Sequence, residues 1–440
     1  MAIKHLLNPK RCSNFRKIFV NLHNISFTFA GELIINMTKN IKLIAILISL
    51  LAVFATSCSD NEPESLPTQR TILVYMAANN SLGNMNCDTK DLEEMKAAVT
   101  NGALGNNNRL MIFYAPTGGS QTLYEMLPTG NLNKVVEYSG TEFAVSADFM
   151  LKVFNDTKSY APAFSYGLIM WSHAMGWTEN GMEDDGPNSP NTESDGLSPK
   201  TWGDDRGRTM KISTLGRVLE ASPWDWVYFD CCFMGSVEVA YELRYAVPMM
   251  VASASEIPLD GMPYEKNLPL LFEPEPDLIG AAQNTFDYYN NRTGQDQTCT
   301  ISVLDLTRMD ALAHATKNIY SQVSYVVPTK FSNLPLDIYS THLFYDFGVW
   351  VKGLVQQAEI NNPGNSSLLN TGLSDWEKAY SDVVLYKAAT PMLWSMIDLS
   401  RFSGISTYIP RTESQLNYRG YNTLQWYDKV ARYLFEQSTY

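Results

Sequence analysis

The sequence is poor in histidine, in metal-binding spacings and in positive charge. Among 440 residues only five are histidine and six are cysteine. No CxxC or HExxH spacing occurs, so no metal site of those types is indicated. Lysine and arginine number 33 against 46 aspartates and glutamates, giving a formal net charge of −13. A nucleic-acid-binding protein normally presents a basic face, so we expect no nucleic-acid partner. Solubility is the simpler explanation of the acidic charge, which is also compatible with cationic substrates.

The N-terminal part lacks an apolar run long enough for a comfortable membrane span, but it has the form of a secretory signal. "MTKNIKLIAILISLLAVFATSC" combines a short basic start, an apolar run and small residues before Cys58. Its end is similar to a bacterial lipobox, in which the cysteine is lipidated. We therefore expect a signal peptide at 37–57, lipidation of Cys58, a tether at 58–69, and a lipid anchor in the bacterial cell envelope, at the outer membrane. Residues 1–36 have no role in this scheme; a start codon assigned too early is a simpler explanation than a genuine extension.

Removal of this segment leaves few residues that could carry chemistry. Three histidines remain, namely His173, His314 and His342. Four cysteines other than the lipidated one remain, namely Cys87, Cys231, Cys232 and Cys299. Four thiols could form disulfides in an oxidising compartment, but their spacing does not resemble a disulfide framework.

The rest of the chain alternates between short apolar runs and helical patterns. The chain is 45% hydrophobic, enough for one large core or two. The apolar runs are continuous rather than alternating, as expected for parallel strands covered on both faces; they lie at 70–78, 109–116, 166–173, 226–232 and 248–255. This pattern predicts an α/β fold with a mostly parallel sheet flanked by helices. We expect one domain at 70–265 and a helix-rich α+β part at 266–440 packed on it, with strands near 297–306 and 404–410 and helices at 276–290, 306–325 and 374–388.

A long polar segment at 178–208 interrupts this alternation. It is rich in Asp, Glu, Asn, Gly and Pro, which predicts an exposed loop. Disorder with a regulatory use is the first interpretation. The second is a calcium site, although no EF-hand spacing supports it; its candidate ligands are Glu183, Asp184, Asp185 and Asp195.

Two neighbouring predicted strands end in reactive side chains, "YGLIMWSH" in His173 and "WVYFDCC" in two cysteines. Open α/β sheets place their active sites at the carboxyl ends of strands. A thiolate nucleophile with an imidazole that manages its proton is the requirement of cysteine catalysis. A helix that starts after the cysteines would also lower the pKa of a thiol through its positive end. The alternative is that both side chains are ordinary core residues.

Alternation along the strand indicates which cysteine is the nucleophile. Side chains of a strand point to opposite faces in turn, so Asp230 and Cys232 share one face and Cys231 takes the other. With Cys232 as the nucleophile, Asp230 lies beside it in the same cleft and can pair with a cationic substrate. With Cys231 as the nucleophile, Asp230 becomes a buried acid without a role. We therefore assign Cys232.

These segments resemble the clostripain-like cysteine peptidases, relatives of caspases, legumains and gingipains. The family's opening strand is similar to "ILVYMAANNSL", its histidine motif to "GLIMWSHAMGW", its cysteine motif to "FDCCFMGSVEVAYEL", and a later strand to "SGISTYIP". The resemblance extends from about Arg70 to the end of the chain. It implies a caspase-like fold and an endopeptidase with a Cys232–His173 dyad that requires no cofactor. We expect a monomer whose substrates are proteins or peptides with basic residues.

The resemblance also implies further site residues. Family members usually cleave after Arg or Lys, with Asp230 and a second acid, here Asp260, in the pocket for the basic side chain. The amide after the catalytic histidine helps to bind the oxyanion together with that of Cys232. Glycine is common at that position, whereas this chain has Ala174, which keeps the N–H but adopts a positive φ less readily.

Relatives are thought to cut themselves in the loop between the two catalytic strands. No basic residue occurs between His173 and Lys200, so the candidate positions are Lys200, Arg206 and Arg208. A solvated insertion without any such role is the alternative. For the whole protein, the rival interpretation is an inactive surface lipoprotein that binds peptides or glycans in the same cleft.

Overall fold

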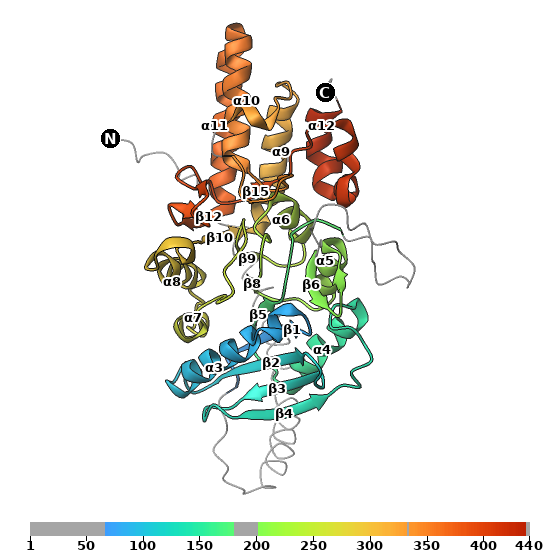
Figure 1. The fold of residues 1–440 in the computed structure, drawn as a ribbon, viewed down its shortest axis with the longest axis vertical. Coiled ribbons are helices and arrows are strands. Elements are labelled where there is room, and N and C mark those ends of the chain that lie inside the picture. The colour runs from blue at the N-terminus through green and yellow to red at the C-terminus, as the bar shows by residue number, and fades with distance from the viewer. Residues whose placement is uncertain (1–66, 180–200, 332–333, 437–440) are drawn as a thin grey trace, which may run out of the picture. The chain divides into compact units, whose positions relative to one another are not determined.

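A computed structural model describes residues 67–179, 201–331 and 334–436, whose elements are drawn in Figure 1. The centre is a nine-stranded sheet in the order β12-β10-β9-β8-β5-β1-β2-β3-β4. Its strands are β1 (Arg70–Ala78), β2 (Asn108–Pro116), β3 (Thr122–Met126), β4 (Leu132–Glu137), β5 (Ser165–Trp171), β8 (Trp226–Asp230), β9 (Met249–Ala252), β10 (Thr300–Asp305) and β12 (Val384–Ala389). The strands from β9 to β2 are mutually parallel, and the strands beyond them on either side are antiparallel. The predicted α/β fold is confirmed.

Helices cover both faces of this sheet. They are α2 (Ser81–Asn84), α3 (Cys87–Thr100), α4 (Ala147–Tyr160), α5 (Ile212–Ala221), α6 (Val237–Leu243), α7 (Tyr264–Leu271), α8 (Leu278–Asn290), α9 (Met309–Tyr320), α10 (Phe347–Asn361), α11 (Ser366–Val383) and α12 (Arg432–Phe435). Helices α3, α7 and α8 lie on one side of the sheet in Figure 1, and α4 and α5 lie on the other.

Strand β1 shows why the apolar runs become central strands. All nine of its residues are buried. Leu73 and Tyr75 pack into a core shared with α4, α5, α6 and α9, and Ile72 and Val74 pack into a second core shared with α3, α7 and α8. A strand between two cores has no polar face, which is why its sequence is continuously apolar.

The part of the chain after residue 265 also contributes to the central sheet. β10 pairs with β9, and β12 pairs with β10, so one sheet includes strands from both predicted parts. The predicted helix at 374–388 is wrong in its last residues, because α11 ends at Val383 and β12 follows. β12 is an edge strand with several partly exposed residues, so no continuous apolar run marks it.

Short strands complete the fold, and the sequence analysis did not predict most of them. β6 (Trp202–Asp205) and β7 (Arg208–Met210) form a hairpin, β11 (Tyr345–Asp346) pairs with β15 (Ser406–Thr407), and β13 (Met392–Leu393) pairs with β14 (Ile397–Asp398). The strand expected at 404–410 is thus reduced to two residues outside the main sheet.

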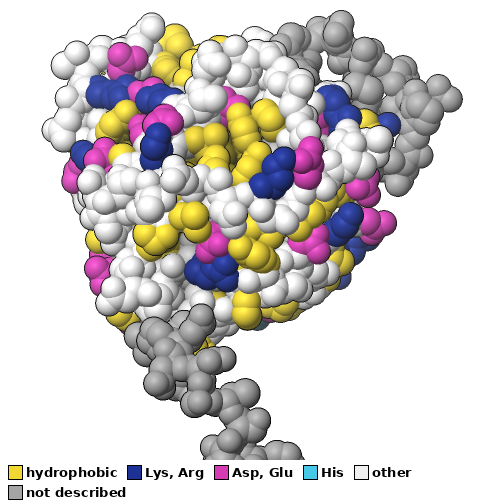
Figure 2. Space-filling view, turned by 90° about the horizontal axis from the view of Figure 1, so that it is seen from below, with side chains coloured by type: hydrophobic (Ala, Val, Ile, Leu, Met, Phe, Trp, Pro, Cys, Tyr) yellow, Lys and Arg dark blue, Asp and Glu magenta, His cyan; other side chains and the backbone are white. Residues whose placement is uncertain are grey.

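The surface shown in Figure 2 mixes Lys and Arg with Asp and Glu, and hydrophobic side chains lie between them. No large area of basic side chains is visible on that face. Among the residues that the structure describes, no helix combines the length and the apolar character that crossing a membrane requires.

Candidate active site

The candidate site lies at the carboxyl ends of β1, β5 and β8. The chain passes from β1 to β2 in one direction across the sheet, and then returns to place β5 and β8 on the other side of β1. Such a change of direction leaves a crevice at the carboxyl ends of the strands, where α/β proteins bind ligands. A pocket of about 310 Å³ opens there, and its lining includes His173, Asp230, Cys231, Cys232, Glu256 and Trp394.

Cys232 lies two residues after the end of β8 and is partly exposed in this pocket. The Ile257 N–H donates to its Sγ over 3.4 Å. Burial raises the pKa of the Cys232 thiol to about 12, against the lowering effect of that amide, and Glu256 raises it further. The thiol is therefore protonated at neutral pH, and a base must remove its proton before it can attack.

The backbone that follows Cys232 is constrained. Phe233 has a φ of 60°, which is uncommon for a bulky side chain. Its N–H donates to the carbonyl oxygen of Ser255 (3.0 Å), and its ring stacks on Phe344 with centroids 4.2 Å apart. These contacts hold the sharp turn between β8 and α6, which begins at Val237 after the N-cap Ser236. A turn that is held in this way presents the thiol at the strand end.

Cys231 has different surroundings. Only 1% of it is exposed, and it packs into the core beside α4, α5 and α6. Burial raises its thiol pKa well above the usual value. Cys231 is thus more buried than Cys232, as the alternation of side chains along the strand predicts.

His173 follows β5 by two residues and lines the same pocket. The Gly203 N–H donates to its carbonyl oxygen over 2.8 Å. The hydroxyl group of Ser81 lies 2.7 Å from its Nε2 atom. The sequence analysis gave Ser81 no role. Its position three residues after the end of β1 could have indicated that it lies near His173, because β1 and β5 are neighbouring strands.

Ala174 carries one of the two amides expected to bind an oxyanion. Its φ is not positive, so the alanine side chain brings no backbone strain. Ala174 and Trp202 form an isolated antiparallel β-bridge. The N–H groups of Met175 and Gly203 donate its two hydrogen bonds, and the N–H group of Ala174 takes no part in them. Among the described residues, no backbone oxygen accepts a hydrogen bond from the amides of Ala174 or Cys232. Both amides thus remain candidates for the oxyanion site.

Asp230 forms a buried acidic wall of the pocket. It accepts hydrogen bonds from the Met262 N–H and the Tyr264 hydroxyl group, each over 2.9 Å, and only 5% of it is exposed. Gly261 has a φ of 61°, and a Cβ atom there would lie 3.0 Å from the carboxylate. Burial raises the pKa of Asp230 to about 7, although both hydrogen bonds lower it.

A second buried acid lies near Asp230, and the sequence gave no sign of it. Asp91 on α3 is 1% exposed and accepts a hydrogen bond from Trp171 Nε1 over 2.6 Å. Trp171 is the register partner of Asp230 on the neighbouring strand. Burial raises the pKa of Asp91 to about 9, and the charge of Asp230 contributes to this rise. The pocket is therefore backed by two carboxyl groups that resist simultaneous ionisation.

Asp260 lies near the pocket but is not one of its lining residues. Its carboxylate pairs with Lys90 Nζ and with Arg292 Nη2, each over 2.5 Å, and Tyr288 donates to it over 3.3 Å. The paired cations lower its pKa against the effect of burial. Its negative charge is thus already matched within the chain.

The remaining predicted residues lie elsewhere or outside the described residues. Arg206 and Arg208 belong to the β6–β7 hairpin, where both guanidinium groups stack on Phe143 with centroid distances of 4.2 Å. His314 and His342 do not line the pocket and contact Asn318 and Asp337. Cys58, Lys200 and the four calcium candidates lie outside the described residues, as do the expected extension, signal peptide and most of the tether.

The described residues contain no group of three or more His, Cys, Asp or Glu side chains that could hold a metal ion. Their four cysteines are all free thiols. At the carboxyl ends of the strands, the pocket is lined by thiol, imidazole and carboxyl groups.

Comparison with known proteins gives one family and one fold. A model of the clostripain family matches residues 74–435. No protein with curated annotation matches the chain. An inactive zymogen C11 protease from Parabacteroides distasonis is 24% identical with a TM-score of 0.67, covering 83% of this chain and 99% of that chain.

Two further structures come from Bacteroides thetaiotaomicron. A secreted C11 cysteine protease in complex with an irreversible peptide inhibitor is 26% identical with a TM-score of 0.64, covering 82% of this chain and 99% of that chain. A secreted C11 cysteine protease named iotapain is 23% identical with a TM-score of 0.69, covering 83% of this chain and 99% of that chain. The caspase-like arrangement expected from the sequence is confirmed by this likeness.

Proposed function

Because the chain belongs to the clostripain family, we propose that it is a cysteine endopeptidase that cleaves peptide bonds after Arg or Lys with a Cys232–His173 dyad. The observation that carries this proposal is the lining of one pocket of about 310 Å³ by a thiol, an imidazole and a buried carboxyl group. Each of these groups lies at or directly after the carboxyl end of a parallel strand, so the fold itself brings them together.

In the proposed reaction, His173 takes the proton of the Cys232 thiol, and the thiolate attacks the substrate carbonyl carbon. The negative charge that develops on the carbonyl oxygen is stabilised by the amides of Ala174 and Cys232. The imidazolium then gives its proton to the leaving amine as the C–N bond breaks, which leaves a thioester on Cys232. Water, deprotonated by His173, attacks the thioester and releases the acid product and the thiol.

The preference for basic residues depends on Asp230. Its carboxyl group is one of the pocket-lining acids, and a lysine or arginine side chain that enters beside it would favour the ionised form over the protonated one. Glu256, which also lines the pocket and accepts a hydrogen bond from the Tyr339 hydroxyl group over 2.8 Å, adds negative charge near the thiol. A substrate with a neutral or acidic side chain would leave the carboxylates of Asp230 and Glu256 without a cationic partner.

A peptidyl ketone electrophile that carries a basic side chain tests the proposal. We expect covalent modification of Cys232, located by mass spectrometry of the digested adduct, and little reaction with the matched compound that carries aspartate. Equal reaction with both compounds contradicts the specificity. Reversible binding without an adduct supports the rival, a non-catalytic binding protein, and overturns the enzyme.

We also propose that the mature chain begins at a lipidated Cys58 and is exposed at the cell surface. The basic start, apolar run and lipobox-like end support this, and two structural neighbours are described as secreted proteases. Mass spectrometry of the N-terminal peptide from the membrane fraction is expected to show an acylated Cys58. An unmodified peptide that spans positions 57 and 58 contradicts the anchor.

Self-cleavage between the catalytic strands is proposed at Lys200. The other two candidates lie in the β6–β7 hairpin, where Arg208 is the first residue of β7. Arg206 lies in the turn with a φ of 57°, and its side chain bonds Asp205 and the Glu142 carbonyl oxygen. A protease needs an extended and accessible segment, which a tight hairpin does not provide. Sequencing of new N-termini in the wild type and in Cys232→Ala is expected to find a cut after Lys200 in the wild type alone.

A further inference from the structure

Ser81 occupies a position at which it contacts the proposed catalytic base. It is the first residue of α2, directly after the turn that follows β1, and it is exposed. Its Oγ atom lies 2.7 Å from His173 Nε2, well within hydrogen-bond distance. Leu82, the next residue of α2, lines the same pocket, so the start of this helix forms part of the site.

The residue before Ser81 fixes this helix against the histidine strand. Asn80 caps α2 by accepting a hydrogen bond from the Leu82 N–H over 2.9 Å. Its side-chain amide donates to the carbonyl oxygens of Ala77 and Asp204, each over 2.8 Å, and it approaches the Ser172 hydroxyl group over 3.4 Å. Asn80 is itself buried. The backbone of Ser81 is thus anchored to β1 and to the β6–β7 hairpin rather than left to move with the surface.

The residue before His173 is anchored to the same groups. The Ser172 hydroxyl group donates to the Ala77 carbonyl oxygen over 2.8 Å and accepts from the Asp204 N–H over 3.0 Å. Asn80 and Ser172 therefore share two partners, Ala77 and Asp204. This shared set fixes Ser81 and His173 relative to each other, so their contact is a built feature of the site.

The contact has a chemical consequence for the imidazole. When the Ser81 oxygen accepts the proton of Nε2–H, the neutral ring carries its lone pair on Nδ1. The thiol proton of Cys232 is then transferred to Nδ1, and the resulting imidazolium keeps its charge-assisted hydrogen bond to Ser81. A third group of this kind orients the base in other dyads and triads of nucleophilic catalysis.

We propose that Ser81 is a positioning residue for His173: its hydroxyl group holds Nε2, fixes the tautomer and directs the opposite ring nitrogen to the Cys232 thiol. This inference rests on the proposed function, since it assigns a role within the same dyad. It requires only a proton transfer between groups of this chain and no further reactant.

The experiment uses the full chain with Ser81→Ala and Ser81→Thr, and with Ser381→Ala as the matched control. Ser381 is also an exposed serine with a local hydrogen bond, to the Lys378 carbonyl oxygen on α11 (2.8 Å). We expect Ser81→Ala to lower kcat about 10-fold with KM unchanged, because a hydrogen bond to a charged group is lost. The acidic limb of its pH profile should move to lower pH, because the imidazolium has lost a partner. Ser81→Thr should restore kcat to within about 2-fold, and Ser381→Ala should match the wild type.

The rate at which iodoacetamide alkylates Cys232 is a second readout that does not depend on turnover. It should fall in Ser81→Ala at neutral pH, because less thiolate forms, and should stay at the wild-type value in Ser381→Ala. If the wild type cleaves no peptide but alkylation still depends on Ser81, the proposed function fails and this inference stands. If the wild type is active and Ser81→Ala keeps its kcat, its pH profile and its alkylation rate, the inference is overturned. A lower melting temperature without these changes also overturns it, because that outcome shows a structural role only.

Discussion

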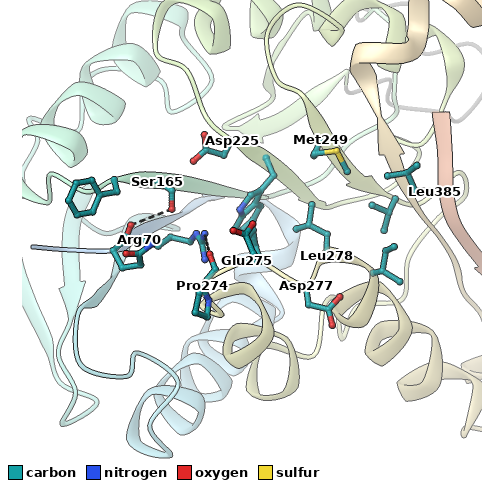
Figure 3. A pocket seen from close by; sticks show the side chains of 15 residues that line it. Arg70, Ser165, Asp225, Met249, Pro274, Glu275, Asp277, Leu278 and Leu385 are labelled. Atoms are coloured by element: carbon teal, nitrogen blue, oxygen red, sulfur yellow. Dashed lines mark hydrogen bonds between the residues drawn. The ribbon is translucent and has the colours of Figure 1, made fainter. Parts of the chain in front are cut away.

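The two ends of the parallel strands each carry a pocket, and the larger pocket lies at the end that has no thiol. At the amino ends a pocket of about 590 Å³ is lined by the first residues of β1, β5, β8 and β9, and Figure 3 shows Arg70, Ser165, Asp225 and Glu275 around it. The pocket at the carboxyl ends has about 310 Å³. Size alone would therefore select the end of the sheet opposite to the thiol and the imidazole.

The ionisable side chains at the two pockets differ in their surroundings. At the amino ends, the Arg70 guanidinium group donates to the backbone oxygens of Leu271, Glu273 and Pro274, while its Nε atom has no partner among the described residues. At the carboxyl ends, burial raises the pKa of Asp230 to about 7, and Asp91 retains one side-chain oxygen atom without a partner among the described residues. Groups whose pKa is strongly raised by burial and by a neighbouring charge cluster at functional sites, and Asp91 beside Asp230 is such a group.

The largest expected effect separates the two cysteines at the carboxyl ends. Cys232→Ala should reduce kcat by at least about 10⁴-fold, because it removes the proposed nucleophile. Cys231→Ala should keep most of the activity and lower the free energy of unfolding by about 1 kcal/mol, because it removes a small side chain from a core. Steady-state kinetics and urea unfolding measure the two effects. Loss of activity in a correctly folded Cys231→Ala would reverse the assignment.

The next effect compares one acid from each pocket. Asp230→Asn should reduce discrimination between basic and neutral substrates by about 10- to 150-fold, because a charge-assisted contact contributes about 1.5–3 kcal/mol. Asp225→Asn in the amino-end pocket should leave kcat/KM for both substrates unchanged. The ratio of kcat/KM for Arg- and Gln-containing peptides measures this. An equal loss for both peptides in Asp230→Asn shows that the acid supports the fold rather than the specificity.

The central strands and the two reactive strand ends were predictable, because their signals are local. The run at 70–78 is the whole of β1, since a strand buried on both faces must be continuously apolar. His173 and Cys232 come directly after two such runs, so parallel strands alone bring them to one end of the sheet. The choice of Cys232 needed only the alternation of side chains, and the two cysteines do differ in exposure.

The contacts between distant segments were not predictable, because no local pattern encodes them. Ser81 looks like any exposed serine after a strand, and only the folded chain shows its hydroxyl group at His173. Asp91 reads as a polar helical position, yet the fold buries it against Trp171. The resemblance assigns Asp260 to the pocket for the basic side chain, and no local pattern indicated that Lys90 and Arg292 would reach it from α3 and from the end of α8.

A smaller effect concerns the stability cost of the acidic pocket. Asp91→Asn should raise the free energy of unfolding at pH 8, because asparagine keeps an acceptor for Trp171 without an ionisable group. Below about pH 4 both folded and unfolded chains carry the proton on Asp91, so the variant should have no advantage there. Between that pH and about 9 only the unfolded chain releases the proton, so the wild type loses stability as pH rises. Urea unfolding at several pH values checks this, and an advantage that does not change with pH contradicts it.

The smallest expected effect is at Asp260, an acid at the carboxyl ends that is already paired with two cations of the chain, unlike Asp230. Lys90 and Arg292 already neutralise this acid, and its side chain is 28% exposed. Asp260→Asn should therefore lower kcat/KM for basic substrates less than 3-fold and lower the free energy of unfolding by less than about 1 kcal/mol, as for other partly exposed ion pairs. Lys90→Ala sharpens the comparison, because it leaves Asp260 with Arg292 alone and should increase its attraction for a substrate cation. A loss of 10-fold or more in Asp260→Asn, confined to basic substrates, would show that the substrate displaces Lys90 and that Asp260 belongs to the pocket, as the family resemblance implies.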